Sequence, residues 1–450
     1  MAARDKRRHN SHTVGDEGNS LKRIRGGNKG WVSKASRFRG RIATVVITGA
    51  LLAWSSNAGA IPGALDSAFG GGDGKATVAF GTGAYAWGAA MSPDGTIVLA
   101  GSAGPDLAVA RLASDGTPDP SFDGDGATTT SVTPGGGDQA DGVTVQPDGK
   151  IVAVGTADLD SFLIVRYLSD GSLDPGFGGG DGIVTTNVGG GFETAFDAVV
   201  QPNGKIVVVG STGTTRPKFV VARYDEGGTL DPLFGNGDGI TITPFGVWGQ
   251  LRAVALTPAG KIVAAGTNGG GFALARYRLN GTLDPTFGDH GTVASTSAPA
   301  TAEDIQLLPA GKIVVAGDLD YFRGQVARYM PNGKPDATFG GDGSVNVKFG
   351  AGEQSFRGVA VQSNGRILAG GYVGPHEFGD STIPRMTVAR FRTNGALDGT
   401  FGTAGKVNIQ FPGGAFGADA LLQPDGAFVI AGFSDQAATA GFAAARLLPN

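Results

Sequence analysis

The fold follows from one stretch of the sequence, Gln146-Pro147-Asp148-Gly149-Lys150-Ile151-Val152-Ala153-Val154-Gly155. Pro-Asp-Gly is a turn sequence, and the β-branched run after it is typical of a strand. The same turn recurs with its glycine at positions 95, 149, 204, 260, 311, 365 and 426. Two other anchors recur with it in constant order: an Asp-x-x-Phe motif with phenylalanine at 69, 122, 177, 234, 287, 339 and 401, and a strand end with arginine at 111, 166, 223, 276, 328, 390 and 446. These anchors predict seven structural repeats.

Each repeat has the sequence pattern of β-structure. In 162–167 and 205–210, β-branched and aromatic residues dominate, with turn residues on either side. Three strands are clear in each unit: one before the turn, one after it and one ending at the arginine. A fourth comes either from the Leu-Asp-Pro-x-Phe-Gly segment or from the stretch after it, such as 182–186, and the sequence leaves both open. Repeated four-stranded units are typical of a β-propeller, with an open β-solenoid as the alternative.

The two ends of the chain decide between these architectures. The last unit stops at Arg446-Leu447-Leu448-Pro449-Asn450, where every other unit continues into its Asp-x-x-Phe motif. The missing motif lies at the other end, as Gly63-Ala64-Leu65-Asp66-Ser67-Ala68-Phe69. A ring explains this division, because a blade shared between the termini removes two open sheet edges. We therefore predict an all-β, seven-bladed β-propeller over 61–450, monomeric, with a composite N- and C-terminal closing blade.

The repeat also resembles a known family. Val145–Val152, Arg166-Tyr167 and Ser169–Gly178 together resemble the bacterial delta-sixty repeat family, and the motif layout is similar to the NHL propeller repeat. The resemblance covers 63–450 and implies an exported propeller, while it supplies no catalytic residues. The first unit departs from the pattern, because Asp123 stands where the other units have glycine after the phenylalanine.

The N-terminus has the pattern of an export signal. Residues 1–41 carry twelve Lys/Arg against three acidic residues, which predicts a basic, disordered leader. The apolar run 42–54 is too short to span a bilayer and is followed by Ala58-Gly59-Ala60, a small-x-small cleavage pattern. We expect a signal peptide in 42–60, cleavage after Ala60, and a secreted or cell-surface protein. An uncleaved membrane tether is the alternative.

Composition excludes several functions. The chain has no cysteine, so it has no disulfide, thiolate metal site or cysteine nucleophile. Beyond the leader it carries 24 basic and 37 acidic residues, and this net negative charge argues against nucleic-acid binding.

An arginine–aspartate pair recurs with the repeats. The motif aspartate follows the motif arginine by eight residues in six units, and Asp66 takes the same place after Arg446 once the ring is closed. A hairpin would bring the two side chains together for bidentate bonding, so we interpret the pairs as structural staples. The pairs are Arg111 with Asp119, Arg166 with Asp174, Arg223 with Asp231, Arg276 with Asp284, Arg328 with Asp336, Arg390 with Asp398, and Arg446 with Asp66.

The sequence offers little for metal or catalytic chemistry. Glycine–aspartate runs such as Gly235-Asn236-Gly237-Asp238-Gly239 occur once per unit and decay in two units, which favours tight turns and leaves calcium as an alternative. After processing only His290 and His376 remain, and there is no Gly-x-Ser-x-Gly elbow. We therefore predict no metal site, no cofactor and no catalytic residue.

The sixth unit carries the longest loop between its second and third strands, and ligand sites of propellers lie in such loops. Its candidate ligand-binding residues are Tyr372, His376, Glu377, Asp380 and Arg385. A tolerated surface insertion is the alternative.

Two classes of function are compatible with these observations. The first is a non-enzymatic binding or scaffold propeller with a protein, glycan or small molecule on one face. The second is an enzyme of the channel, a metal- or carboxylate-dependent lyase or glycoside hydrolase. Acidic side chains that break the sevenfold symmetry near the channel would discriminate between them.

Overall fold

The computed structural model describes residues 61–81, 83–158, 160–295, 299–375, 383–434 and 440–449. They belong to one compact unit, 57–450. The leader and signal predicted in 1–60 lie outside the described residues. Within these stretches, no helix has the length and apolar character needed to cross a membrane.

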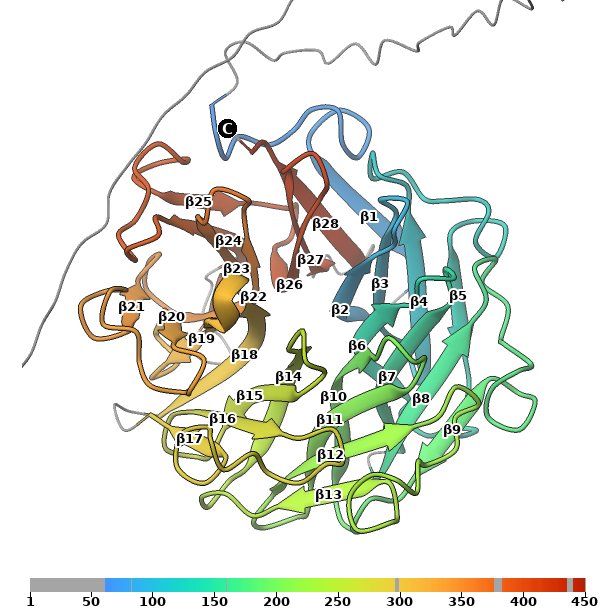
Figure 1. Ribbon diagram of the computed structural model, residues 1–450. Coiled ribbons are helices and arrows are strands. Elements are labelled where there is room, and N and C mark those ends of the chain that lie inside the picture. The colour runs from blue at the N-terminus through green and yellow to red at the C-terminus, as the bar shows by residue number, and fades with distance from the viewer. Residues whose placement is uncertain are drawn as a thin grey trace, which may run out of the picture. The chain divides into compact units, whose positions relative to one another are not determined.

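Seven four-stranded antiparallel sheets form the blades of a β-propeller (Figure 1). The innermost strands of neighbouring blades contact one another around the central axis. These strands are β2 (Ala84–Met91), β6 (Gln139–Val145), β10 (Glu193–Val200), β14 (Gln250–Leu256), β18 (Ala300–Leu307), β22 (Glu353–Val361) and β26 (Ala415–Leu422).

The two middle strands of each blade are its second and third strands in chain order, and one loop connects them. The second strands are β3 (Ile97–Ala103), β7 (Ile151–Ala157), β11 (Ile206–Thr212), β15 (Ile262–Thr267), β19 (Ile313–Leu319), β23 (Ile367–Gly374) and β27 (Phe428–Ser434). The third strands are β4 (Asp106–Leu112), β8 (Ser161–Tyr167), β12 (Lys218–Tyr224), β16 (Phe272–Tyr277), β20 (Arg323–Tyr329), β24 (Arg385–Phe391) and β28 (Gly441–Leu447).

The structure shows which segment forms the fourth, outermost strand of each blade, a point that the sequence left open. It is the stretch after the Leu-Asp-Pro-x-Phe-Gly segment, and that segment makes only an isolated bridge, such as Tyr167 with Leu173. The outer strands are β5 (Ala127–Thr130), β9 (Ile183–Thr186), β13 (Ile240–Thr243), β17 (Thr292–Ala294), β21 (Ser344–Val347), β25 (Lys406–Ile409) and β1 (Lys75–Ala79), and one 3₁₀ turn, η1, spans Pro309–Gly311.

The predicted composite blade is confirmed. β1 from the N-terminal side pairs with β28 from the C-terminal side in the order β1-β28-β27-β26. The register places Lys75 opposite Ala445 and Ala79 opposite Gly441, and Leu65 forms a bridge with Leu447. The first and last segments of the ring are thus joined by main-chain hydrogen bonds.

The core lies between blades. Every residue of β7 and β11 is buried, because alternate side chains face the blade before and the blade after. Val152 and Val154, for example, share one apolar cluster with Val208 and Val220 of the next blade. Burial on both faces explains why the middle strands are continuous apolar runs, as in other sheets that are covered on both sides.

Candidate functional site

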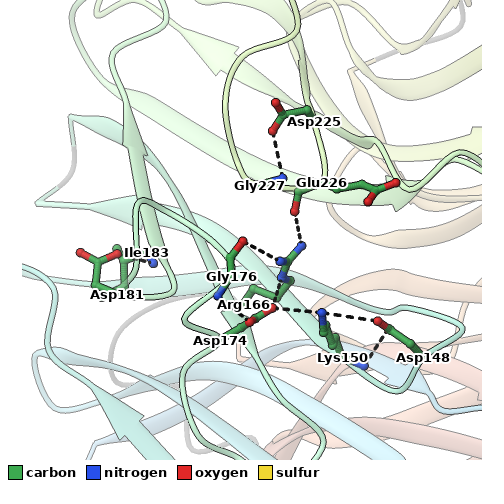
Figure 2. Close-up of polar contacts among 10 residues, drawn as sticks. All are labelled: Asp148, Lys150, Arg166, Asp174, Gly176, Asp181, Ile183, Asp225, Glu226 and Gly227. Carbon is green, nitrogen blue, oxygen red and sulfur yellow. Dashed lines mark hydrogen bonds and ion pairs between the residues drawn. The ribbon is translucent and has the colours of Figure 1, made fainter.

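The repeated arginine contacts its motif aspartate and its motif phenylalanine in every blade. In the second blade Arg166 Nε lies 2.7 Å from Asp174 Oδ2 (Figure 2). The guanidinium carbon of Arg166 lies 4.4 Å from the Phe177 ring centre. The phenylalanine is at most 1% exposed in all seven blades, so the ring supports the guanidinium from the core side. The same Nε–Asp contact measures 2.7–3.0 Å in five other blades, and across the closure Arg446 reaches Asp66 through Nη2 at 2.8 Å.

The geometry differs from the expected bidentate pair. Arg166 uses Nε for the aspartate, while its Nη1 donates to the backbone carbonyl of Glu226 in the next blade at 2.6 Å (Figure 2). Each arginine therefore links two blades as well as one hairpin. The corresponding carbonyls belong to Ser169 for Arg111, Leu279 for Arg223, Pro331 for Arg276, Thr393 for Arg328, Pro449 for Arg390 and Ser114 for Arg446.

Several motif aspartates also contact a second cation from the Pro-Asp-Gly turn region. Lys261 Nζ and Lys312 Nζ each lie 2.7 Å from Asp284 and Asp336 respectively. Burial opposes ionisation of these two carboxyls, but hydrogen bonds from lysine, threonine and arginine outweigh it and lower the pKa of each. In the described part of the chain, the second cation recurs in five of the seven units, at Asp174, Asp231, Asp284, Asp336 and Asp398. This repetition identifies it as architecture rather than a binding site.

The glycine–aspartate runs form turns. The carboxylate of Asp238 accepts the backbone N–H of Ile240 at 3.0 Å, and Asp73 and Asp181 do the same two residues ahead. Among the described residues no three His, Cys, Asp or Glu side chains lie together as metal ligands would. His290 lies on the surface beside Asp289 with 91% of its side chain exposed.

The seven units differ from one another where each innermost strand has a β-bulge. At the same point of each of these strands the pairing register shifts by one residue. A bulge bends the strand and redirects the extra side chain, here toward the central channel. The bulge residues are Trp87, Asp141, Phe196, Arg252, Glu303, Arg357 and Ala418.

The bulge residues line a cavity at the mouth of the channel. It measures about 330 Å³ and also contacts Tyr372, Phe416 and Phe433. It adjoins a wider opening of about 620 Å³ that reaches Trp248 and Tyr321. We call the smaller space the mouth cavity.

One wall of the mouth cavity is charged. Glu303 Oε2 lies 3.1 Å from Arg357 Nη1 and 3.7 Å from Arg252 Nη1, so one carboxylate serves two guanidinium groups. Burial opposes the charge of Arg357, but the negative charges of Glu303 and Asp318 outweigh it and raise the pKa of this arginine. Arg252 lies 4.2 Å above the Phe196 ring centre, and its buried Nε has no hydrogen-bond partner.

Two acidic groups near this wall have a pKa above the ordinary value of a carboxyl group. Burial raises the pKa of Asp141 to about 7, although Gln139 donates hydrogen bonds to its carboxyl. Burial and the neighbouring charge of Glu303 raise the pKa of Asp318 to about 6. Such groups occur preferentially at functional sites.

The opposite wall is aromatic. Trp87 stacks near Tyr85, with ring centres 6.1 Å apart and planes 17° from parallel, and Phe433 meets both edge-on at 5.0–5.1 Å. Phe416 continues the group toward Tyr372 at 5.2 Å. Tyr85 and Trp87 are each 38% exposed, so the cluster is partly open to solvent, and of these two rings Trp87 lines the mouth cavity.

Three aspartates lie directly below the bulge residues, and we call them the channel aspartates: Asp197, Asp304 and Asp419. Each accepts a backbone N–H from the next innermost strand, at 2.6–2.9 Å. Burial raises the pKa of Asp197 and Asp304 to about 7 and that of Asp419 well above its ordinary value. The strands approach closely here, since a Cβ on Gly142 would lie 2.5 Å from the Phe196 carbonyl oxygen.

The candidate ligand-binding residues predicted from the loop of the sixth unit do not lie together at one site. Tyr372 lines the mouth cavity, and its ring centre lies 5.7 Å from the guanidinium carbon of Arg357. Arg385 is exposed at the start of β24, opposite Val373, and does not line this cavity. His376, Glu377 and Asp380 lie outside the described residues.

The sequence did contain a signal for the bulge residues that our prediction missed. Each of them lies eight residues before the turn glycine of its unit. This position differs in chemical type between units, while the arginine, aspartate and phenylalanine anchors stay constant. A repeat position that varies in a chain of otherwise constant anchors indicates a site where architecture does not dictate the residue.

Comparison with known proteins supports the fold. Six segments match a family described as "Domain of unknown function (DUF5122) beta-propeller": 92–122, 146–177, 201–234, 258–287, 308–339 and 362–401. Six of the seven repeats thus match a β-propeller family. This description does not mention delta-sixty repeats, so that resemblance stays a prediction. No curated protein matches the chain.

Solved propellers are similar at low identity. The WD40 β-propeller domain of Doa1 is 12% identical, with 83% of this chain and 97% of that chain covered and a TM-score of 0.45. YCF48 bound to D1 peptide is 14% identical, covering 88% and 100%, with a TM-score of 0.46. The PQQ-bound aldose sugar dehydrogenase from Streptomyces coelicolor is 14% identical, covering 70% and 97%, with a TM-score of 0.40. These similarities carry no information on ligand or activity.

Proposed function

We propose that this chain is an exported, non-enzymatic binding propeller that holds its ligand in the mouth cavity. The observation that carries the proposal is the contrast between constant and variable positions. The Arg–Asp–Phe contacts recur in all seven blades, whereas the bulge residues converge on one cavity with a different chemistry from almost every blade. A concave site with aromatic lining and a few polar groups is the usual form of a ligand pocket.

Export is the part of the proposal that rests on the sequence alone. The apolar run 42–54 and the Ala58-Gly59-Ala60 pattern support it. The proposed location is outside the cell or on its surface.

The proposal is tested by a ligand-detected NMR screen of the full chain against small molecules, glycans and peptides at pH 7. We expect Arg357→Gln to abolish binding of the molecules that the screen finds. The matched control is Arg323→Gln, because Arg323 is an exposed arginine that pairs with Asp320 and does not line the mouth cavity. Equal binding by both variants would contradict a site at the mouth.

A second candidate is a carboxylate-dependent enzyme of the same cavity. Asp141, with a pKa of about 7, and Glu303, which is paired with arginine, give two carboxyls in different surroundings within one cavity. A glycoside hydrolase separates its acid and its base in this way. Release of reducing ends from a glycan that the protein binds, lost in Asp141→Asn, would favour the enzyme over the binding module.

A further inference from the structure

The mouth cavity has two unlike walls, and a ligand must satisfy both. The aromatic wall offers the rings of Trp87, Phe416 and Phe433, and Trp87 is partly open to solvent. The charged wall offers the guanidinium groups of Arg252 and Arg357 and the carboxylate of Glu303. The ligand therefore needs an apolar face on one side and polar groups on the other.

The charges of the polar wall already compensate one another. Glu303 lies within 4 Å of both arginines, and Asp318, with a pKa of about 6, adds a second negative charge beside them at neutral pH. Two carboxylates thus balance two guanidinium groups, and a small anion would compete with these carboxylates. A small cation would in turn face two arginines. Net charge on the ligand is therefore not what this wall is built to recognise.

A neutral molecule with several hydroxyl groups fits this wall without displacing an internal pair. A hydroxyl both donates and accepts, so it can donate to the Glu303 carboxylate and accept from an arginine N–H at the same time. The Arg252 guanidinium has five N–H donors, of which Nη2 donates to Gln250 and Nη1 faces Glu303, so it can serve a hydroxyl as well. Asp141 and Gln139 add a carboxyl and an amide beside the same cavity.

The size of the cavity limits the ligand. About 330 Å³ lies at the small end of the range for ligand pockets, about 300–1,000 Å³. A six-membered sugar ring has an apolar C–H face that can pack on an aromatic ring and a rim of hydroxyl groups. It combines the two properties that the walls require.

We propose, on the basis of the binding function proposed above, that the mouth cavity holds a neutral pyranose unit, packed on Trp87 and hydrogen-bonded to Arg252, Glu303 and Arg357. The wider opening beside it, about 620 Å³, leaves space for a second sugar of a glycan chain. The ligand class is thus a neutral mono- or oligosaccharide.

The test uses the full chain and saturation-transfer-difference NMR. The probes are glucose, galactose, mannose, N-acetylglucosamine and their disaccharides, with 4-hydroxybenzoate and benzylamine as an aromatic anion and an aromatic cation. We expect at least one saccharide to bind, Trp87→Ala to weaken it roughly tenfold, and Trp87→Phe to retain most of the affinity. Glu303→Gln should weaken it by about ten- to a hundredfold, because a charged hydrogen-bond acceptor is lost.

Two control variants have their side chains away from the mouth cavity. Phe192→Ala removes an aromatic ring that is 62% exposed, and Glu226→Gln neutralises an exposed glutamate, so neither should change binding. Circular dichroism checks that each variant is folded.

The outcomes separate the ligand class from the site. Binding of no saccharide, or of 4-hydroxybenzoate or benzylamine in place of saccharides, would overturn the sugar assignment. If 4-hydroxybenzoate or benzylamine binds in place of saccharides and Trp87→Ala abolishes that binding, the mouth cavity remains the binding site and only the ligand class is wrong. A saccharide that binds Trp87→Ala as tightly as the natural chain would overturn both the sugar site and the proposed function.

Discussion

The closure of the ring can be tested at one ion pair. Arg446→Ala removes the contact of 2.8 Å to Asp66, the hydrogen bond of 2.7 Å to the Ser114 carbonyl, and the guanidinium that lies 5.1 Å from the Phe69 ring centre. The side chains of Arg446 and Asp66 are only 11% and 12% exposed. Breaking a buried pair costs roughly 3–5 kcal/mol, so we expect Arg446→Ala to lower the free energy of unfolding by about 3 kcal/mol or more.

The pair itself accounts for part of that loss, and a double-mutant cycle isolates it. The Ser114 hydrogen bond disappears whether or not Asp66 is present, whereas the ion pair needs both side chains. We expect a coupling of roughly 1–3 kcal/mol between Arg446 and Asp66, which is the range for a hydrogen bond between charged groups. Equilibrium unfolding of the full chain in guanidinium chloride measures the three variants.

Two controls belong to this cycle. Arg111 with Asp119 has the same contact distance, 2.8 Å, within one hairpin, and should give a similar coupling. Arg385→Ala changes an exposed arginine and should stay within about 0.5 kcal/mol. Additive effects of Arg446→Ala and Asp66→Ala would refute the reasoning, because they would show that the termini do not share this contact in solution.

Two further predictions follow from the structure and a third from the sequence. Burial raises the pKa of Asp197 and Asp304 to about 7, above the ordinary value that applies in the unfolded chain, so the folded chain holds protons that the unfolded chain has released, and the free energy of unfolding should fall as pH rises from about 5 to 7. The change should be roughly 1–3 kcal/mol, since each group still faces the channel, and Asp304→Asn should flatten the pH profile obtained by urea unfolding. Gly116→Ala should destabilise the chain more than Gly104→Ala, because both glycines have positive φ but only at Gly116 would a Cβ meet Phe69, at 2.7 Å; equal midpoints in thermal unfolding would contradict this packing. N-terminal sequencing of protein from culture supernatant should start at or near Ile61, and material found only in membranes with an intact leader would contradict cleavage.

The ring could be predicted from the sequence because each repeat has the same residue types at the same positions. Three features can be recognised from residue types alone: the turn glycines, the eight-residue Arg–Asp offset, and the motif that is divided between the two termini. The composite blade and the pairing of β1 with β28 follow from these features alone. The outer strand was harder to place, because a short segment such as Ile183–Thr186 and the Leu-Asp-Pro-x-Phe-Gly segment before it both have the composition of a strand edge.

Contacts and distortions of the main chain could not be predicted, because they do not require a particular residue type. The second partner of Arg166 is the carbonyl of Glu226, and a carbonyl is present at every residue whatever its side chain. The bulges are likewise a property of strand pairing, so no residue type is common to all seven side chains that they turn into the channel. Trp87, Arg252 and Glu303 could have been found only by aligning the seven units and asking which position varies. Tyr372 was predicted from loop length, and it lies in the mouth cavity.

The central claim is that the variable bulge residues, and not the repeated Arg–Asp–Phe contacts, form the binding site. The most direct measurement is a crystal structure of the full chain with the best-binding molecule from the screen. We expect electron density for the ligand in the mouth cavity, between Trp87 and Arg357. Density on the opposite face, beside the Pro-Asp-Gly turns and the repeated arginines, would contradict it.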